Sequence, residues 1–153
     1  MTRMHVAVPV RWSDLDAYSH VNNARMLTLL EEARIAAFWN DPNADAPTAL
    51  LETGPDASSI TLVAAQRVEY LAPMPFHREP LDVELWIGRL GGASIEVCYE
   101  IFSPLAVEPR TLYTRAATTL VLVDRLTAVP RRLSDLERAA WQPYVEQPVA
   151  FRG

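Results

Sequence analysis

The sequence lacks the features that mark several large classes of protein. It has a single cysteine, Cys98, so no disulfide can form within the chain, and a reducing compartment is expected. Its longest basic run is the pair Arg131–Arg132 and its formal net charge is −5, which disfavours a nucleic-acid binder. No apolar stretch approaches the roughly 18 residues that a membrane span needs. We therefore expect a soluble, cytoplasmic protein with no membrane span and no nucleic-acid partner.

Metal ligands are equally sparse. The chain has three histidines, and neither His5 nor His77 stands at a spacing typical of a zinc site. Cys98 falls inside a strand-like run, where we interpret it as a packed, inert thiol. The sequence thus predicts no metal site.

The residues that are present fit one globular domain. Half of the 153 residues are apolar, which is enough to bury a substantial core. No repeat, low-complexity tract or long linker divides the chain, so we expect a single domain spanning residues 1–153.

The stretch from Val10 to Phe38 organises the predicted fold. Apolar residues alternate from His5 to Trp12, with Val6, Val8, Val10 and Trp12 on one face of a predicted strand. A polar loop, Ser13 to Asn23, leads into the only long helix that the sequence supports, from about Asn23 to Trp39. Helical spacing places Met26, Leu29, Leu30, Ala33, Ala36 and Ala37 on a broad apolar face, extended by Leu27, Ile35 and Phe38. Glu31 and Arg34 intrude at i,i+3 spacing, where we expect a partly buried ion pair.

Strands dominate the remainder of the chain. A short helix is expected between Asp45 and Gly54, and Ser134 with Glu137 has capping-box spacing for a C-terminal helix that stops near Pro143. Gly91–Gly92 predicts a hairpin turn, because both residues accept positive φ. The run Leu120 to Val123 predicts a central strand covered on both faces. The predicted strands are Ile60–Leu71, Leu81–Leu90, Ala93–Phe102 and Thr111–Val123.

These elements predict an α+β architecture. One long central helix would be wrapped by a curled antiparallel sheet of about five strands, since a single helix cannot hide so much apolar surface unless the sheet curls around it. Such a layer leaves sheet edges unprotected, so we expect a homo-oligomer, at least a dimer, joined edge to edge.

The loop before the helix holds the candidate chemistry. The free N–H groups of a helix N-terminus favour negative charge, so the preceding Asp16 and His20 make a plausible reactive site. Structural roles are open for the same residues: Asp16 as a helix cap or turn residue, His20 as a histidine that hydrogen-bonds across the loop, and Asn22 and Asn23 as caps. Asp14 is interpreted as a turn former.

The motif R-W-S-D-L-D-A-Y-S-H-V-N-N-A, followed by L-L-E-E-A-R, resembles the hot-dog-fold acyl-thioesterases. The likeness is closest to the 4-hydroxybenzoyl-CoA thioesterase-like branch, and the stretch D-L-D-x-x-x-H-V-N-N also resembles plant acyl-carrier-protein thioesterases. The resemblance implies the hot-dog fold, dimers or tetramers, and cofactor-free hydrolysis of a fatty or aromatic acyl-CoA, or of an acyl-carrier protein.

The resemblance also implies a role for each loop residue. Asp16 would attack the thioester carbonyl or activate the water that does, and the backbone N–H of Asn23 would hold the carbonyl oxygen. His20 matches a histidine implicated in the plant enzymes, and Tyr18 stands where those enzymes carry Asn. Tyr18 and Asn22 are the expected substrate-binding residues. Glu31 is an alternative carboxylate, because some hot-dog enzymes place theirs on the helix.

Two further functions stay open on sequence grounds. A hot-dog hydratase or dehydratase would add or remove water beside the thioester, but the dehydratase signature H-F-P-G is absent. A non-catalytic acyl-CoA-binding module is the other, although known sensors carry a DNA-binding segment for which this chain has no spare length.

Overall fold

The computed structural model describes residues 3–38 and 57–152. The expected helix between Asp45 and Gly54 lies outside the described residues, as does Trp39, the expected last residue of the long helix. The elements, in chain order, are β1 (Met4–Val8), the 3-10 turn η1 (Trp12–Asp14), α1 (Asn23–Phe38), β2 (Ser59–Tyr70), β3 (Leu81–Leu90), β4 (Ser94–Phe102), β5 (Leu112–Asp124), α2 (Asp135–Trp141) and the 3-10 turn η2 (Gln142–Tyr144).

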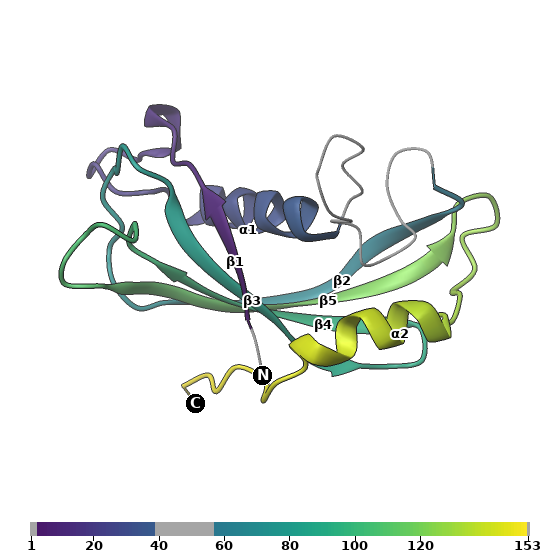
Figure 1. Cartoon of the computed structure of the whole chain (residues 1–153). Coiled ribbons are helices and arrows are strands. Elements are labelled where there is room, and N and C mark those ends of the chain that lie inside the picture. Colours follow the sequence, from purple (N-terminus) through teal and green to yellow (C-terminus); the bar gives the residue numbers. More distant parts are fainter. Residues whose placement is uncertain (1–2, 39–56, 153) are drawn as a thin grey trace.

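The five strands form one curled antiparallel sheet in the order β1-β3-β4-β5-β2 (Figure 1). The expected antiparallel sheet of about five strands is confirmed. The apolar run Leu120–Val123 lies in β5, which has a neighbour on each side, as the sequence predicted. β1 and β2 are the edge strands.

Helix α1, 16 residues long, lies on one face of the sheet (Figure 1). Alternate residues of β3, such as Val83 and Leu85, are fully buried in the cluster that includes this helix, because successive side chains of a strand point to opposite faces. Leu27 and Ala36, expected on the apolar face, are exposed instead. The buried apolar residues of α1 are Met26, Leu29, Leu30, Ala33, Ala37 and Phe38.

The predicted extent of the first strand needs correction. The first strand ends at Val8 rather than Trp12, since Pro9 has no N–H to donate to a neighbouring strand. Trp12 belongs to η1 and is 74% exposed, with its ring edge-on to Phe76 at 5.4 Å between centroids.

The turn between β3 and β4 is present at Gly91–Gly92, where the Gly91 N–H donates to the Ser94 carbonyl (2.8 Å). Neither glycine has a φ between +20° and +160°, so the turn does not use the left-handed backbone expected from the sequence. A Cβ at position 91 would lie 2.5 Å from Oγ of Ser94 and 3.3 Å from its carbonyl oxygen, so a larger residue there would have to displace the Ser94 side chain.

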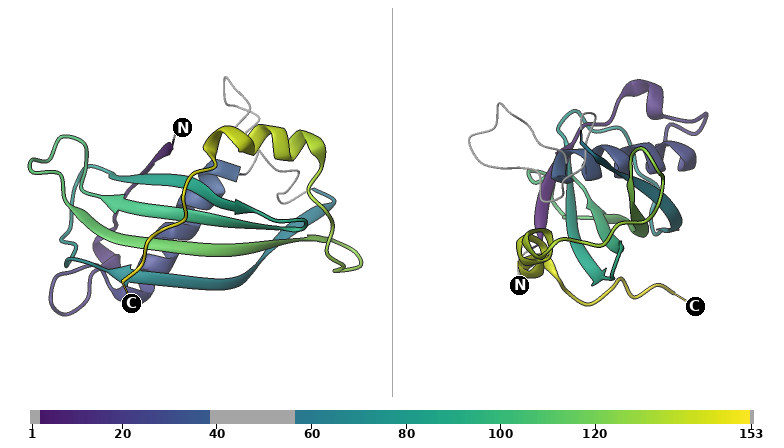
Figure 2. Two further views of the ribbon diagram at one scale, coloured as in Figure 1. Left: turned by 90° about the horizontal axis from the view of Figure 1, so that it is seen from below. Right: turned by 90° about the vertical axis from the view of Figure 1, so that its right-hand side faces the viewer.

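The C-terminal part lies along the β3 side of the sheet and then crosses its face. Ser134 caps α2 as predicted: its hydroxyl accepts from the Glu137 N–H (3.1 Å) while the Glu137 carboxylate accepts from the Ser134 N–H (2.9 Å). The segment after η2 then crosses the strands, as Figure 2 shows from below, and its main-chain carbonyls accept hydrogen bonds from Trp86 and Arg115 (both 2.9 Å). This segment covers the sheet face opposite α1. Within residues 3–38 and 57–152, no helix has the length and apolarity needed to cross a membrane.

Candidate active site

A pocket of about 300 Å³ opens at the N-terminus of α1. It brings together three residues predicted from the loop: Asp16, His20 and Asn23. The remaining lining comes from the loop, from α1 and from the end of β2 with the segment that follows it. These lining residues are Val21, Met26, Tyr70, Leu71, Ala72, Pro73 and Met74.

Main-chain pairing fixes the loop against the segment after β2. Leu15 and Val21 form an antiparallel bridge that closes the loop on itself. The Val21 N–H donates to the Met74 carbonyl (2.8 Å), and His20 pairs with Pro75 in a second antiparallel bridge. The pocket is therefore built from two segments about fifty residues apart in the sequence.

Asp16 uses one carboxylate oxygen to shape the loop. Its Oδ1 accepts hydrogen bonds from the N–H groups of Tyr18 (2.8 Å) and His20 (3.2 Å). Ser19, between these two donors, has a left-handed φ of 63°, which the tight turn requires. The turn role considered for Asp16 is thus present. Its Oδ2 makes no hydrogen bond with any residue that the structure describes.

The start of α1 is capped by Asn22, not by Asp16. The Asn22 side-chain oxygen accepts from the Ala24 N–H (2.8 Å), which is the geometry of an N-cap residue. The Asn23 N–H has no hydrogen-bond acceptor among the described residues, while the carbonyl of Asn23 accepts from the Tyr70 hydroxyl (2.9 Å). One main-chain donor of a residue that lines the pocket is therefore left without a partner among the described residues.

Asp14 is a buried structural residue, fully shielded from solvent. Its carboxylate accepts from the Arg11 N–H (2.8 Å) and from the Arg11 guanidinium (3.0 Å). Burial alone would raise the pKa of Asp14, but these hydrogen bonds and the positive charge of Arg11 outweigh it and leave that pKa lowered. Asp14 is thus a turn residue, as interpreted from the sequence, and it does not line the pocket.

The two expected substrate-binding residues do not line the pocket. Tyr18 is 81% exposed, and the side chain of Asn22 is engaged as the helix cap. The His20 ring makes no hydrogen bond with the described residues, so the cross-loop role considered for it is carried by its main chain alone.

Sequence reasoning missed the contribution of β2 and the segment after it. Tyr70, the last residue of β2, and Met74 form one wall of the pocket. No local pattern marks them, because their position depends on the pairing of the loop with residues 74 and 75.

Glu31 belongs to a different pocket, of about 250 Å³, which Arg34 also lines. The predicted ion pair is present, with 3.8 Å between the Arg34 guanidinium and the Glu31 carboxylate. Its two members differ in exposure: the Arg34 side chain is 9% exposed and the Glu31 side chain 62% exposed. Arg34 also donates to the Tyr99 hydroxyl (3.3 Å). The alternative carboxylate is therefore not part of the site that contains Asp16.

Cys98 is fully buried, and burial raises the pKa of its thiol to about 12. The predicted packed, inert thiol is confirmed, because so little thiolate exists near neutral pH.

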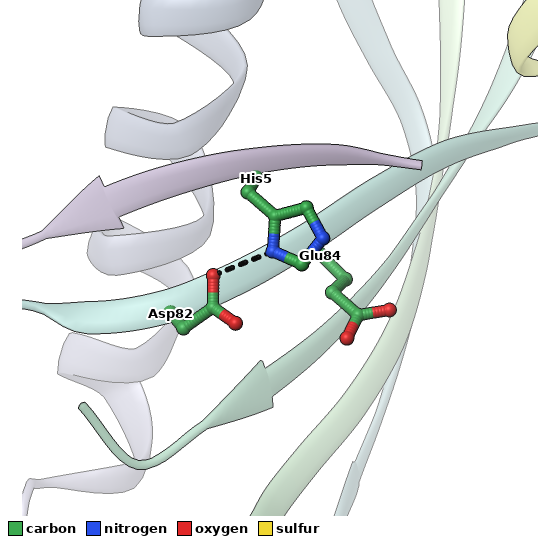
Figure 3. Close-up of side chains that lie close together, drawn as sticks. All are labelled: His5, Asp82 and Glu84. Atoms are coloured by element: carbon green, nitrogen blue, oxygen red, sulfur yellow. Dashed lines mark hydrogen bonds and ion pairs between the residues drawn. The ribbon is translucent and has the colours of Figure 1, made fainter. Parts of the chain in front are cut away.

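A second polar cluster lies at the β1 edge, where His5 meets Asp82 and Glu84 of β3 (Figure 3). No partners of His5 were predicted, since the register of β1 on β3 cannot be derived from the sequence. His5 Nδ1 lies 2.9 Å from Asp82 Oδ1, and Arg110 contacts both Asp82 (2.8 Å) and Glu84 (2.6 Å). Because Arg110 pairs with both carboxylates and Arg3 also pairs with Glu84 (3.1 Å), we interpret the cluster as an ion-pair network that fastens the edge strand rather than as a metal site.

Comparison with known proteins identifies the family. Residues 10–148 match the model of the thioesterase-like superfamily. Among solved structures, the PA2801 protein of Pseudomonas aeruginosa, a proposed thioesterase, is 30% identical with a TM-score of 0.69 over 89% of this chain and 95% of that chain. YbaW of Escherichia coli, also a proposed thioesterase, is 26% identical with a TM-score of 0.69 over 94% and 99%.

A third solved structure, the DHNA-CoA thioesterase of Staphylococcus aureus, is 20% identical with a TM-score of 0.67 over 87% of this chain and 82% of that chain, which shows a shared fold. No match was found among curated proteins. The family match spans most of the chain, including the loop, α1 and all of β2 to β5. The protein belongs to the thioesterase-like superfamily and is a thioester hydrolase.

Proposed function

We propose that this protein is an acyl-CoA thioesterase, which hydrolyses a fatty or aromatic acyl-CoA to the free acid and CoA. The observation that carries the proposal is the pocket at the N-terminus of α1. It is lined by a carboxylate that keeps one oxygen unbonded, Asp16, and by the residue whose main-chain N–H is unbonded, Asn23.

The chemistry follows from these two groups. Asp16 either attacks the thioester carbonyl carbon or takes a proton from the water that attacks it. In both routes the carbonyl oxygen becomes negative in the tetrahedral intermediate, and the Asn23 N–H stabilises that charge. Such a preorganised donor typically contributes about 2.7–4 kcal/mol to lowering the barrier. The C–S bond then breaks and CoA leaves as a thiolate. Where water is the nucleophile, the free acid forms in this step; where Asp16 is the nucleophile, the step leaves a mixed anhydride of Asp16 and the acyl group, which water then cleaves to release the acid and restore the carboxylate.

His20 is the third residue in this proposal. It lines the same pocket, and its ring is not engaged by the described residues. It is therefore available to bind the substrate or to protonate the departing thiolate. Neither Tyr18 nor Asn22 lines the pocket. In this proposal they contact the part of the substrate that lies outside it.

The pocket favours an apolar acyl group at the reacting end. Met26, Leu71, Pro73 and Met74 supply apolar walls, which stabilise hydrocarbon by removing it from water. A volume of about 300 Å³ is at the small end of ligand pockets. It holds the thioester and part of the acyl group, so the CoA nucleotide must lie outside it. The carrier portion could equally be the phosphopantetheine arm of an acyl-carrier protein, because the reacting thioester is the same.

The proposal includes a single hot-dog domain with α1 as its central helix, in a cytoplasmic homo-oligomer. Edge strand β2 exposes Leu62 and Val63, each 47% accessible, as expected of a strand that pairs with a second copy. The pocket adjoins the other end of β2, at Tyr70, so a partner placed along that strand would come close to the substrate.

A panel of acyl-CoAs with a thiol-reactive dye tests the function. A thioesterase releases free CoA in step with substrate loss, with a preference among short, long and aromatic acyl groups. A change in enoyl absorbance without free CoA would identify a hydratase, and binding without either signal would identify an acyl-CoA-binding module. Running the same acyl group on acyl-carrier protein decides between the two carriers.

A further inference from the structure

Tyr70 reaches the site from the end of β2, whereas Asp16 and His20 come from the loop before α1. It is the last residue of β2, pairs with Thr114 of β5, and is 46% exposed at the pocket wall. Its hydroxyl donates to the carbonyl oxygen of Asn23 at 2.9 Å. This is a long-range contact between a strand and the first residue of the helix.

The two peptide groups that flank Asn23 have different tasks. The group on its N-terminal side carries the N–H proposed to hold the oxyanion, and the group on its C-terminal side carries the carbonyl bound by Tyr70. The Asn22 N–H donates to the Asp14 carbonyl (2.8 Å), and the Asn22 side chain accepts from Ala24. Tyr70 thus supplies the restraint that comes from the sheet rather than from the loop.

We propose that Tyr70 is a positioning residue for thioester hydrolysis: through its hydrogen bond to the Asn23 carbonyl, it fixes the direction of the Asn23 N–H in the pocket. This inference rests on the proposed function. An oxyanion donor acts through geometry, and a misplacement of about 1 Å can cost a factor of about 10² in rate. Burial raises the pKa of the Tyr70 hydroxyl, which keeps it protonated and able to donate.

The test is Tyr70→Phe, which keeps the ring and removes only the hydroxyl. Turnover (kcat) should fall about threefold to tenfold, while KM stays within twofold and the melting temperature is almost unchanged. The reason is that a contact that acts only on the oxyanion donor affects the transition state and not the bound substrate. Tyr113→Phe is the matched control, since its hydroxyl also makes one hydrogen bond, to His77 (2.9 Å), but neither residue lines the pocket. That variant should keep the parent kcat.

A CoA-linked trifluoromethyl ketone, which forms a tetrahedral adduct, gives a second readout beside its non-reacting thioether analogue. Tyr70→Phe should weaken ketone binding by the factor lost in kcat and leave thioether binding unchanged. Equal weakening of both compounds would mean that the hydroxyl touches substrate directly and would overturn the inference, as would an unchanged kcat. If the parent enzyme releases no CoA from any thioester, the proposed function itself fails.

Discussion

Asp16→Asn separates the two roles that the structure gives to this residue. Asn keeps an oxygen where Asp16 Oδ1 accepts from the N–H groups of Tyr18 and His20, so the turn should survive. The substitution replaces Oδ2, which has no partner in the described parts of the chain, by an amide group without negative charge. The loop should therefore fold as before, and the melting temperature should stay within a few degrees.

The rate should behave differently. Loss of a general base typically lowers turnover by about 10²–10⁴-fold, or about 2.7–5.5 kcal/mol in barrier height. KM should change little, because the carboxylate is not needed to hold the acyl group. CoA release at fixed pH, measured beside a melting curve, checks both expectations. An Asp16→Asn protein that melts normally and hydrolyses acyl-CoA near the parent rate would refute the catalytic assignment.

Asp14→Asn is the matched control, two residues earlier in the same loop. Asp14 is buried and bound to Arg11, and its lowered pKa means that it stabilises the fold above its unfolded pKa. That contribution is lost as the pH falls through the lowered folded-state value. Asp14→Asn should reduce the free energy of unfolding by about 1.5–3 kcal/mol near neutral pH while the folded enzyme keeps its turnover. The two variants should thus show opposite patterns.

Three other predictions follow from the surroundings of the site. Asn22→Ala should lower the free energy of unfolding by about 1 kcal/mol in denaturant titration, whereas Asn22→Ser keeps a cap and should retain most of it; equal stability of the two variants would contradict the capping role. Glu31→Gln should lower the melting temperature slightly, because it weakens the pair with Arg34, and leave turnover within roughly tenfold, about 1.4 kcal/mol in barrier terms; a stable but inactive protein would make Glu31 the catalyst. Light scattering should return at least a dimer at micromolar concentration, and a fully active monomer would contradict the edge-to-edge assembly.

The strands were predictable where apolar and polar residues alternate along the chain. In β3 and β4 the alternation of apolar and polar residues gave the bounds almost unchanged, because a strand places successive side chains on opposite faces. The same rule overextended the first strand to Trp12, since Val10 and Trp12 continue the alternation after Pro9 has ended the pairing. A local pattern does not show where a neighbouring strand stops.

Only the part of the candidate site that comes from one short stretch of sequence was predictable. Asp16 and Asn23 are seven residues apart, so a motif can place them together at a helix start. Tyr70 and Met74 reach the pocket through the bridge between His20 and Pro75, a pairing set by the whole sheet. The same limit applies to the C-terminal segment, which is held on the sheet mainly through its main-chain carbonyls and therefore has no characteristic side-chain pattern.

The turn role and the proposed chemical role of Asp16 do not exclude one another. The turn needs only an oxygen acceptor, which Asn supplies equally well, so it gives no reason for a negative charge at this position. Asp14, in the same loop, does have such a reason, because its charge is paired with Arg11. Asp16 has no ion-pair partner in the described parts of the chain, although it lines a pocket that is largely apolar. The turn alone therefore does not explain a carboxylate at this position, whereas the proposed reaction does. In the proposed reaction, one oxygen holds the loop and the other acts on the thioester.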